Sequence, residues 1–263
     1  MNKTQWAVIL TAAALFTALY FGCDTKPDKH KIIEKQRTLA AVSTDIGSLL
    51  MEAKPGLSPQ DGATILALET ALNSAEDETG KANAFKELSS TWYKFEKPAI
   101  AGYYAEQVAE IDATEEAWSI AGTTFSICVQ REKEKKVKDY CTGHAIKALE
   151  NATSLNPSNL QHKMNLAIVH TENPPAGNPM KGILMLVDLN KQNPDYVPVL
   201  NQLGRLGIQT GQFEKAIKRL GKAVSLEPEN PTSNCLLGEA YQQIGDQANA
   251  AKYLDKCKKL TID

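Results

Sequence analysis

The chain alternates between stretches with apolar residues at helical spacing and short breaks that contain proline or glycine. Within the stretches, apolar side chains recur three or four positions apart, which places them on one face of an α-helix. Two such stripes, 33 residues apart, are Phe85, Leu88 and Trp92, and Trp118, Ala121 and Phe125. Alanine, leucine, lysine and glutamate dominate the composition and favour helix. The pattern therefore predicts an all-α protein.

A second regularity lies upstream of the prolines that end three helical stretches, where small and leucine residues return at three fixed distances. The slots hold Ala145, Leu149 and Ala152 before Pro157; Gly182, Leu186 and Leu189 before Pro194; Ala216, Leu220 and Ala223 before Pro228; and Ala250, Leu254 and Cys257 before Ile262. The residues that end the last three stretches, Pro194, Pro228 and Ile262, are spaced by 34 residues. A fixed period of this length indicates repeated helix pairs.

The repeats are regular only from residue 163 onward. Upstream, the charged run 131–139 lengthens one pair, and we expect it to be a solvated helix extension in a hairpin that turns near Lys136. Five segments follow from these patterns: a membrane anchor or signal segment (1–22), a polar tether (23–30), an N-terminal helical region (31–80), irregular helix pairs (81–162) and regular repeats (163–263).

The helix-pair pattern resembles the tetratricopeptide repeat. Leu203-Gly204 and Leu237-Gly238 match its first helix, and Ala-x-x-x-Leu-x-x-Ala before Pro228 matches its second. The resemblance implies a right-handed solenoid of helix pairs. Residues 178–183 (Asn-Pro-Met-Lys-Gly-Ile) also resemble a stretch in small membrane-tethered tetratricopeptide proteins of bacteria.

The N-terminal segment from Trp6 to Gly22 contains no charged residue. As a helix it would span about 25 Å, which is just long enough for a thin bilayer. Its length, with Trp6 and Tyr20 near opposite ends, favours an uncleaved anchor. A lipoprotein signal with lipidation at Cys23 and a simple cleaved signal are the alternatives, although Tyr20-Phe21 departs from the usual lipobox. By analogy with exported proteins, we expect the helical domain in the periplasm.

Four further cysteines form two candidate pairs. Cys128 and Cys141 flank the predicted hairpin, and Cys235 and Cys257 lie on the two helices of the last repeat. Each pair could be a disulfide in an exported domain. The alternative is ordinary core packing, since Cys257 occupies a slot that alanine fills in other repeats.

The chemistry-bearing residues do not form a recognisable catalytic motif. The net charge of -2 shows no basic excess, so no nucleic-acid partner is expected. Cys141-x-x-His144, with His162 and His170 nearby in sequence, lacks a recognisable set of four zinc ligands. No nucleophile elbow or phosphate loop is present. We therefore expect no enzyme activity, cofactor, metal or small-molecule substrate.

The resemblance also implies where a protein or peptide partner would bind, because five positions of each first helix face the concave surface. In the last two repeats these are Pro198, Asn201, Arg205, Ile208 and Gln209, then Thr232, Cys235, Glu239, Gln242 and Gln243. Only Asn201 and Arg205 suit a carboxylate, and Glu239 opposes one. The positions predict either a partner-binding groove or merely a solvated surface. We expect a membrane-tethered scaffold, with an envelope chaperone or assembly factor as the alternative.

Overall fold

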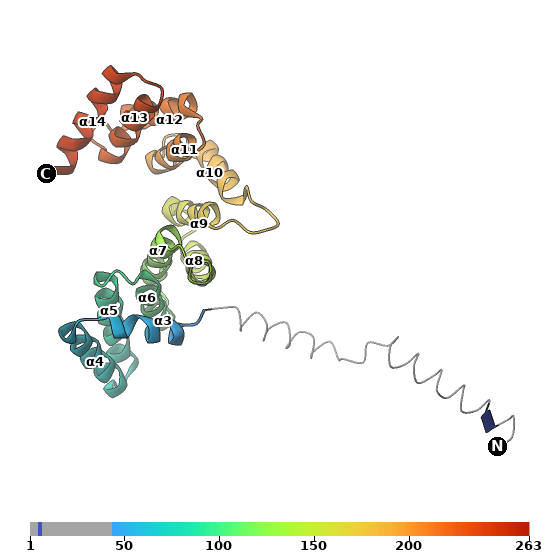
Figure 1. Ribbon diagram of the computed structural model, residues 1–263, viewed down its shortest axis with the longest axis vertical. Coiled ribbons are helices and arrows are strands. Elements are labelled where there is room, and N and C mark those ends of the chain that lie inside the picture. Colours follow the sequence, from blue (N-terminus) through green and yellow to red (C-terminus); the bar gives the residue numbers. More distant parts are fainter. Residues whose placement is uncertain (1–4, 7–43, 263) are drawn as a thin grey trace. The chain divides into compact units, whose positions relative to one another are not determined.

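The computed structural model describes residues 5–6 and 44–262, and a compact helical unit begins at Asp45 (Figure 1). Across residues 44–262 the regular structure consists of twelve α-helices and one short 3-10 helix, with no strand. The predicted all-α class is therefore confirmed. The polar tether, Cys23, most of the apolar N-terminal segment and the predicted helix start at 31–43 lie outside the described residues. No helix in the described ranges is both long and apolar enough to cross a bilayer.

The helical unit begins with two helices that precede the regular pairing. They are α3 (Ile46–Ala53) and α4 (Pro59–Ser74), joined by the 3-10 helix η1 (Lys54–Gly56). The remaining helices form five consecutive pairs. These are α5 (Glu78–Lys94) with α6 (Pro98–Asp112), α7 (Glu115–Arg131) with α8 (Lys135–Leu155), α9 (Leu160–Glu172) with α10 (Lys181–Gln192), α11 (Val197–Gln209) with α12 (Phe213–Leu226), and α13 (Pro231–Gln243) with α14 (Gln247–Ile262).

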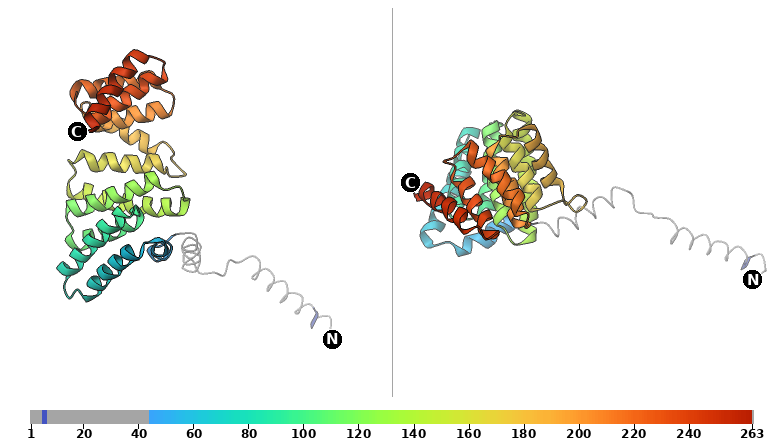
Figure 2. Two further views of the ribbon diagram at one scale, coloured as in Figure 1. Left: turned by 60° about the vertical axis from the view of Figure 1, so that its left-hand side comes forward. Right: turned by 90° about the horizontal axis from the view of Figure 1, so that it is seen from above.

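Each pair packs on the next in the order of the chain, so the pairs stack as a solenoid (Figure 2). Small residues set the spacing between the two helices of a pair. A Cβ added at Gly122 would lie 2.7 Å from the side chain of Leu149, and one added at Gly204 would lie 2.5 Å from Leu220. Gly122 and Gly204 therefore allow the second helix of each pair to approach closely.

In the third pair, the glycine at the contact between the two helices lies on the second helix instead of the first. Where α7, α11 and α13 have Gly122, Gly204 and Gly238, helix α9 carries the large side chain of His170. Its partner helix compensates with Gly182, where an added Cβ would collide with the backbone of α9 at Ala167 and Thr171. The close approach is therefore kept, but the residue that permits it has moved to the second helix.

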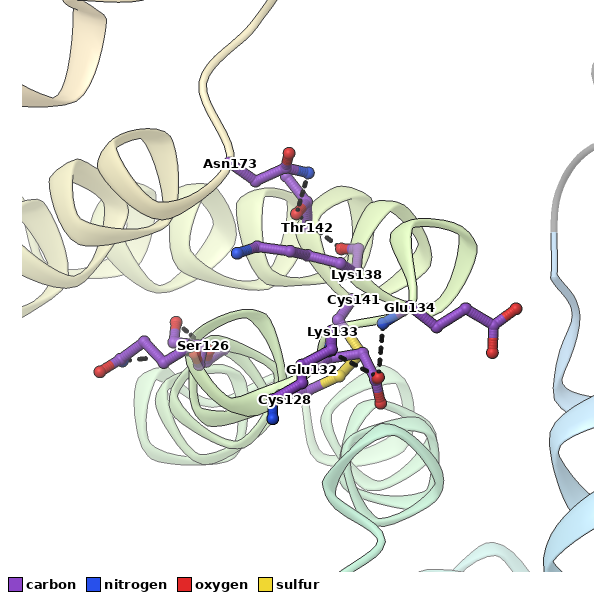
Figure 3. The surroundings of a disulfide bond; sticks show 11 residues. Ser126, Cys128, Glu132, Lys133, Glu134, Lys138, Cys141, Thr142 and Asn173 are labelled. Carbon is purple, nitrogen blue, oxygen red and sulfur yellow. Dashed lines mark hydrogen bonds between the residues drawn. A yellow bond between two sulfur atoms is a disulfide. The ribbon is translucent and has the colours of Figure 1, made fainter.

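The turn between α7 and α8 corrects the interpretation of the charged run. Residues 132–134 leave the helix, and α8 begins at Lys135, so the chain turns at 132–134 and not near Lys136 as predicted. The reason is local. The Glu132 carboxylate accepts hydrogen bonds from the backbone N–H groups of Lys133 and Glu134, at 2.7 and 2.9 Å (Figure 3). These bonds offer the backbone an alternative to the helical pattern.

Both candidate cysteine pairs are disulfides. Cys128 and Cys141 are fully buried and join α7 to α8 beside this turn (Figure 3). Cys235 and Cys257 are half-buried and join α13 to α14. The alternative of ordinary core packing was wrong for both pairs. Each bond ties together the two helices of one pair, so each covalently restrains a single repeat unit.

Candidate binding groove

A groove with a volume of 810 Å³ lies between the first helices of the first two pairs, α5 and α7. Helix α6 contributes to its floor. Its lining is mainly apolar, with hydroxyl groups and a few charges at intervals. The lining residues are Lys86, Ser89, Ser90, Tyr93, Lys94, Ala105, Val108, Asp112, Thr114, Glu116, Ala117, Ser119, Ile120, Thr123, Thr124 and Ile127. We call this the α5–α7 groove.

The repeat frame explains why these side chains face the same space. Ser89 stands in α5 where α7 has Gly122, and its hydroxyl donates a 2.9 Å hydrogen bond to the carbonyl oxygen of Ala101 in α6. Ser90 and Tyr93 lie one and four residues after Ser89 on α5, and Thr123 lies one residue after Gly122 on α7. All three line the groove. They correspond to the positions that the sequence pattern singled out in the last two repeats.

Two large apolar side chains stand exposed on the walls of the groove. Tyr93 on α5 is 44% exposed, and Ile120 on α7 is 53% exposed. Between them the floor is made of buried small and branched residues, Ala105, Val108 and Ala117. Large apolar side chains left in water beside an apolar floor are a feature of surfaces that bind a partner.

Some polar groups of the groove are engaged within the chain and others are not. The ammonium group of Lys86 pairs with Asp112 at 3.0 Å. By contrast, Lys94 and Glu116 have no ion-pair partner in the described part of the chain, and the hydroxyls of Ser90 and Ser119 make no hydrogen bond there. The groove therefore offers a free serine hydroxyl on each of α5 and α7 and one unpaired charge of each sign.

A charged cluster links α6 to α8 in the pairs that form the groove. Glu106 is 2% exposed and bonds with His144, while Lys147 lies 2.8 Å from its other oxygen. Lys147 also pairs with Glu110 at 2.9 Å. Burial alone would raise the pKa of Glu106, but the hydrogen bonds from His144 and Lys147 outweigh it and hold the pKa below its usual range. The cluster fixes two second helices relative to each other.

A second carboxylate, Glu115, joins the second and third pairs. It accepts hydrogen bonds from Asn156 at 3.0 Å and from Asn159 at 2.9 Å, and its Oε1 lies 2.8 Å from Nε2 of His162. The bonds from Asn159, His162 and Asn156 lower the pKa of Glu115, so the group is held as an anion. Glu115 therefore ties the start of α7 to the end of α8 and the start of α9.

The ten positions predicted to face a partner lie on α11 and α13, and none of them lines the α5–α7 groove. Pro198 is half-buried, and Cys235 is in the disulfide with Cys257. Asn201 departs from the expectation, because it is buried and accepts a 2.9 Å hydrogen bond from the hydroxyl of Ser233 in the next repeat. Ile208 is half-buried and packs against the cluster around Leu236. The remaining six are exposed and stay a prediction: Arg205, Gln209, Thr232, Glu239, Gln242 and Gln243.

The residues considered as zinc ligands are engaged separately. Cys141 is in a disulfide, His144 bonds with Glu106, and His162 bonds with Glu115. His170 is buried with no hydrogen-bond partner on either ring nitrogen in the described part. Within the described ranges, no three residues of metal-ligating type are arranged to hold an ion.

Comparison with known proteins identifies the repeat. The family described as "TPR repeat" matches residues 204–245, and the family described as "Tetratricopeptide repeat" matches residues 231–261. No protein of curated function matches the sequence significantly.

Two solved structures share the fold. A thermophilic TPR protein of Thermus thermophilus, TTC0263, matches at 19% identity with a TM-score of 0.50, over 68% of this chain and 91% of that one. The APC/C hetero-tetramer Cut9-Hcn1 matches at 17% identity with a TM-score of 0.51, over 82% of this chain and 39% of that one.

Proposed function

Since the chain is a tetratricopeptide repeat protein, we propose that it is a non-catalytic adaptor that holds a protein partner on the inner face of its solenoid. The observation that carries this proposal is the α5–α7 groove. It combines an apolar floor, the exposed side chains of Tyr93 and Ile120, and polar groups that the chain leaves unused. Such a surface is suited to binding a polypeptide. Its hydroxyls and charges are not arranged as an activated nucleophile with a base.

We also propose that the domain works in the periplasm, next to a membrane. The uncharged segment from Trp6 to Gly22 supports a tether, either as an uncleaved anchor or through lipidation at Cys23. The two disulfides support an oxidising compartment, because disulfides are rare in proteins that remain in a reducing cytosol.

The compartment proposal predicts the state of the thiols in cells. Whole cells would be treated with a membrane-permeant alkylating reagent before lysis, and the protein would then be digested and examined by mass spectrometry. Cys128, Cys141, Cys235 and Cys257 are expected to stay unmodified unless a reductant is added first. Alkylation of these four residues without reductant would contradict an oxidising environment.

The alternative role is an envelope chaperone or assembly factor that holds extended peptides transiently. The apolar lining of the groove favours this role, because an apolar surface discriminates weakly between different polypeptides. The two roles differ in the number of partners. An adaptor binds one defined chain, whereas a chaperone binds many unfolded chains and suppresses their aggregation.

Crosslinking in native membranes, followed by identification of the attached chains, tests the adaptor role. We predict that one defined protein is recovered reproducibly. Recovery of many unrelated chains, with suppression of aggregation by the purified domain, would replace the adaptor by the chaperone. Recovery of no protein above an uncrosslinked control would count against both roles.

A further inference from the structure

We propose that the disulfide between Cys235 and Cys257 is a redox-controlled restraint on the last helix pair: a dithiol opens it in the folded protein, and α14 then separates from α13. The proposal is independent of the α5–α7 groove and of the partner that the groove would hold. The other disulfide, between Cys128 and Cys141, stays closed under the same conditions and serves as an internal reference.

The two disulfides differ in how far solvent reaches them. Cys128 and Cys141 are 1% and 0% exposed, and they lie within the solenoid, where α7 packs on α6, α8 and α9. Cys235 and Cys257 are only half-buried. Thiol–disulfide exchange requires a thiolate to reach one of the two sulfur atoms, so a dissolved dithiol has access to the second bond and not to the first.

Helix α14 buries less of its repeat pattern than the other second helices do. The leucine slot of the pattern is fully buried at Leu149 and Leu220, whereas its counterpart in α14, Leu254, is 36% exposed. Three residues later, α12 has the fully buried Ala223, and α14 has the half-buried Cys257. In the described part of the chain, α14 has extensive contacts with α13 alone. The disulfide therefore supplies an attachment that apolar packing supplies in the other pairs.

Few noncovalent contacts hold α14 once the disulfide is open. Among its described side chains α14 buries Ala250 alone. Tyr253 stacks on Tyr241 of α13, with the ring centroids 5.8 Å apart. Lys256 pairs with Glu229 at 2.9 Å, but this ion pair is exposed and contributes little. Separation of α14 would uncover the apolar face of α13 that now packs against it.

The charges around the disulfide favour attack at Cys257. Helix α14 carries four lysines and one acidic residue, and Lys258 and Lys259 directly follow Cys257. Both lysines are exposed and have no ion-pair partner in the described part of the chain. On α13, by contrast, Glu239 lies one helical turn after Cys235. An attacking thiolate is an anion, so it is attracted toward Cys257 and repelled from Cys235.

The exchange proceeds in two steps. One thiolate of the dithiol attacks Sγ of Cys257, the bond between the two protein sulfurs breaks, and Cys235 leaves as a thiolate that takes up a proton. The second thiolate of the dithiol then attacks its partner sulfur in the mixed disulfide and releases Cys257, which is protonated in turn. The protein gains two electrons and two protons, and the dithiol becomes a disulfide. In an oxidising compartment the closed form is the resting state.

Reduction kinetics of the full-length oxidised protein test the proposal, with dithiothreitol as the dithiol. Samples taken at intervals would be quenched with excess alkylating reagent, digested, and quantified by mass spectrometry for each cysteine. We expect the bond between Cys235 and Cys257 to open at least about tenfold faster than the bond between Cys128 and Cys141. The difference should disappear in guanidinium chloride, where the fold no longer protects either bond.

Hydrogen exchange measures whether α14 separates. After the bond between Cys235 and Cys257 has opened, we expect the amides of α14 to exchange at least about tenfold faster, and those of α8 to stay unchanged within about twofold. The double variant Cys235→Ser with Cys257→Ser should show the same fast exchange in α14 without any dithiothreitol.

A charge variant and a matched control test the attack at Cys257. Lys258→Gln combined with Lys259→Gln should slow the opening about two- to threefold at low ionic strength, where the attraction of the thiolate is least screened. Lys218→Gln, at an exposed position on α12, should leave the rate unchanged. An unchanged rate in the double variant would contradict the part given to these lysines.

Three results would overturn the inference as a whole: equal opening rates of the two disulfides in the folded protein, opening of the bond between Cys235 and Cys257 only in guanidinium chloride, or unchanged exchange in α14 after that bond has opened. None of these results bears on the adaptor role, which is tested by crosslinking of a partner.

Discussion

The buried imidazole of His170 is the residue whose environment predicts the clearest response to pH. The side chain is 3% exposed, and neither ring nitrogen has a hydrogen-bond partner in the described part of the chain. Burial lowers the pKa of His170, the nearby Lys181 lowers it further, and Glu150 raises it by a smaller amount. The folded chain therefore binds this proton less readily than the unfolded chain, whose imidazole titrates near 6.5.

The sign of the pH effect follows from this difference. The contribution of the neutral His170 side chain to the free energy of unfolding is fully present above about pH 6.5. It is lost as the pH falls from there through the lower pKa of His170 in the folded state. We predict that the free energy of unfolding drops more steeply between pH 6.5 and 5 in the unmodified chain than in His170→Leu. Urea unfolding at several pH values would measure both slopes. Parallel curves would show that His170 does not couple folding to protonation.

Glu115 illustrates a role that only the fold can assign to a residue. In the sequence it is one of two adjacent glutamates at a helix start, a common place for acidic residues because of the helix dipole. In the structure its carboxylate binds Asn156, Asn159 and His162, which lie 41 to 47 residues further along the chain. No local pattern indicates these partners, since they meet only after the second and third pairs have stacked.

At the scale of the helices, close approach within a pair depends on particular glycines. Gly204 in α11 faces the side chain of Leu220, whereas Gly221 in α12 has open space around it. We predict that Gly204→Ala lowers the free energy of unfolding by about 1–3 kcal/mol through overpacking. The matched Gly221→Ala should raise it by about 0.5–1 kcal/mol, because alanine is the better helix former. Urea midpoints test the pair, and equal effects of the two substitutions would contradict this packing account.

Most helix boundaries could be predicted because residues with strong local preferences mark them. Pro98 begins α6, and Gly211 and Gly245 follow the ends of α11 and α13 with φ values of +70° and +80°, a backbone conformation that glycine adopts readily. The turn at 132–134 was misplaced because no proline or glycine marks it. The Glu132 carboxylate accepts hydrogen bonds from the two following N–H groups and stops the helix there, and glutamate alone gives no such signal.

At the scale of the whole molecule, the repeat pattern predicted the solenoid, and the partner-binding residues that it singled out lie on other helices than those of the α5–α7 groove. The motif is most regular in the last two repeats, so the inner positions of α11 and α13 were chosen. The same frame, counted from Ser89 and Gly122, gives eight of the residues that line the α5–α7 groove: Lys86, Ser90, Tyr93, Lys94, Glu116, Ser119, Thr123 and Ile127. The open space between α5 and α7 could not be predicted, because it depends on how consecutive pairs stack and not on the local pattern.

The central claim is that the partner of this protein sits in the α5–α7 groove. The most direct test places a photoreactive amino acid at Ile120, in the groove, or at Lys218, at an exposed position on α12, and irradiates living cells that produce each form. The account predicts one crosslinked product from position 120 and none of the same mass from position 218. Equal crosslinking from both positions, or a product from position 218 alone, would contradict it.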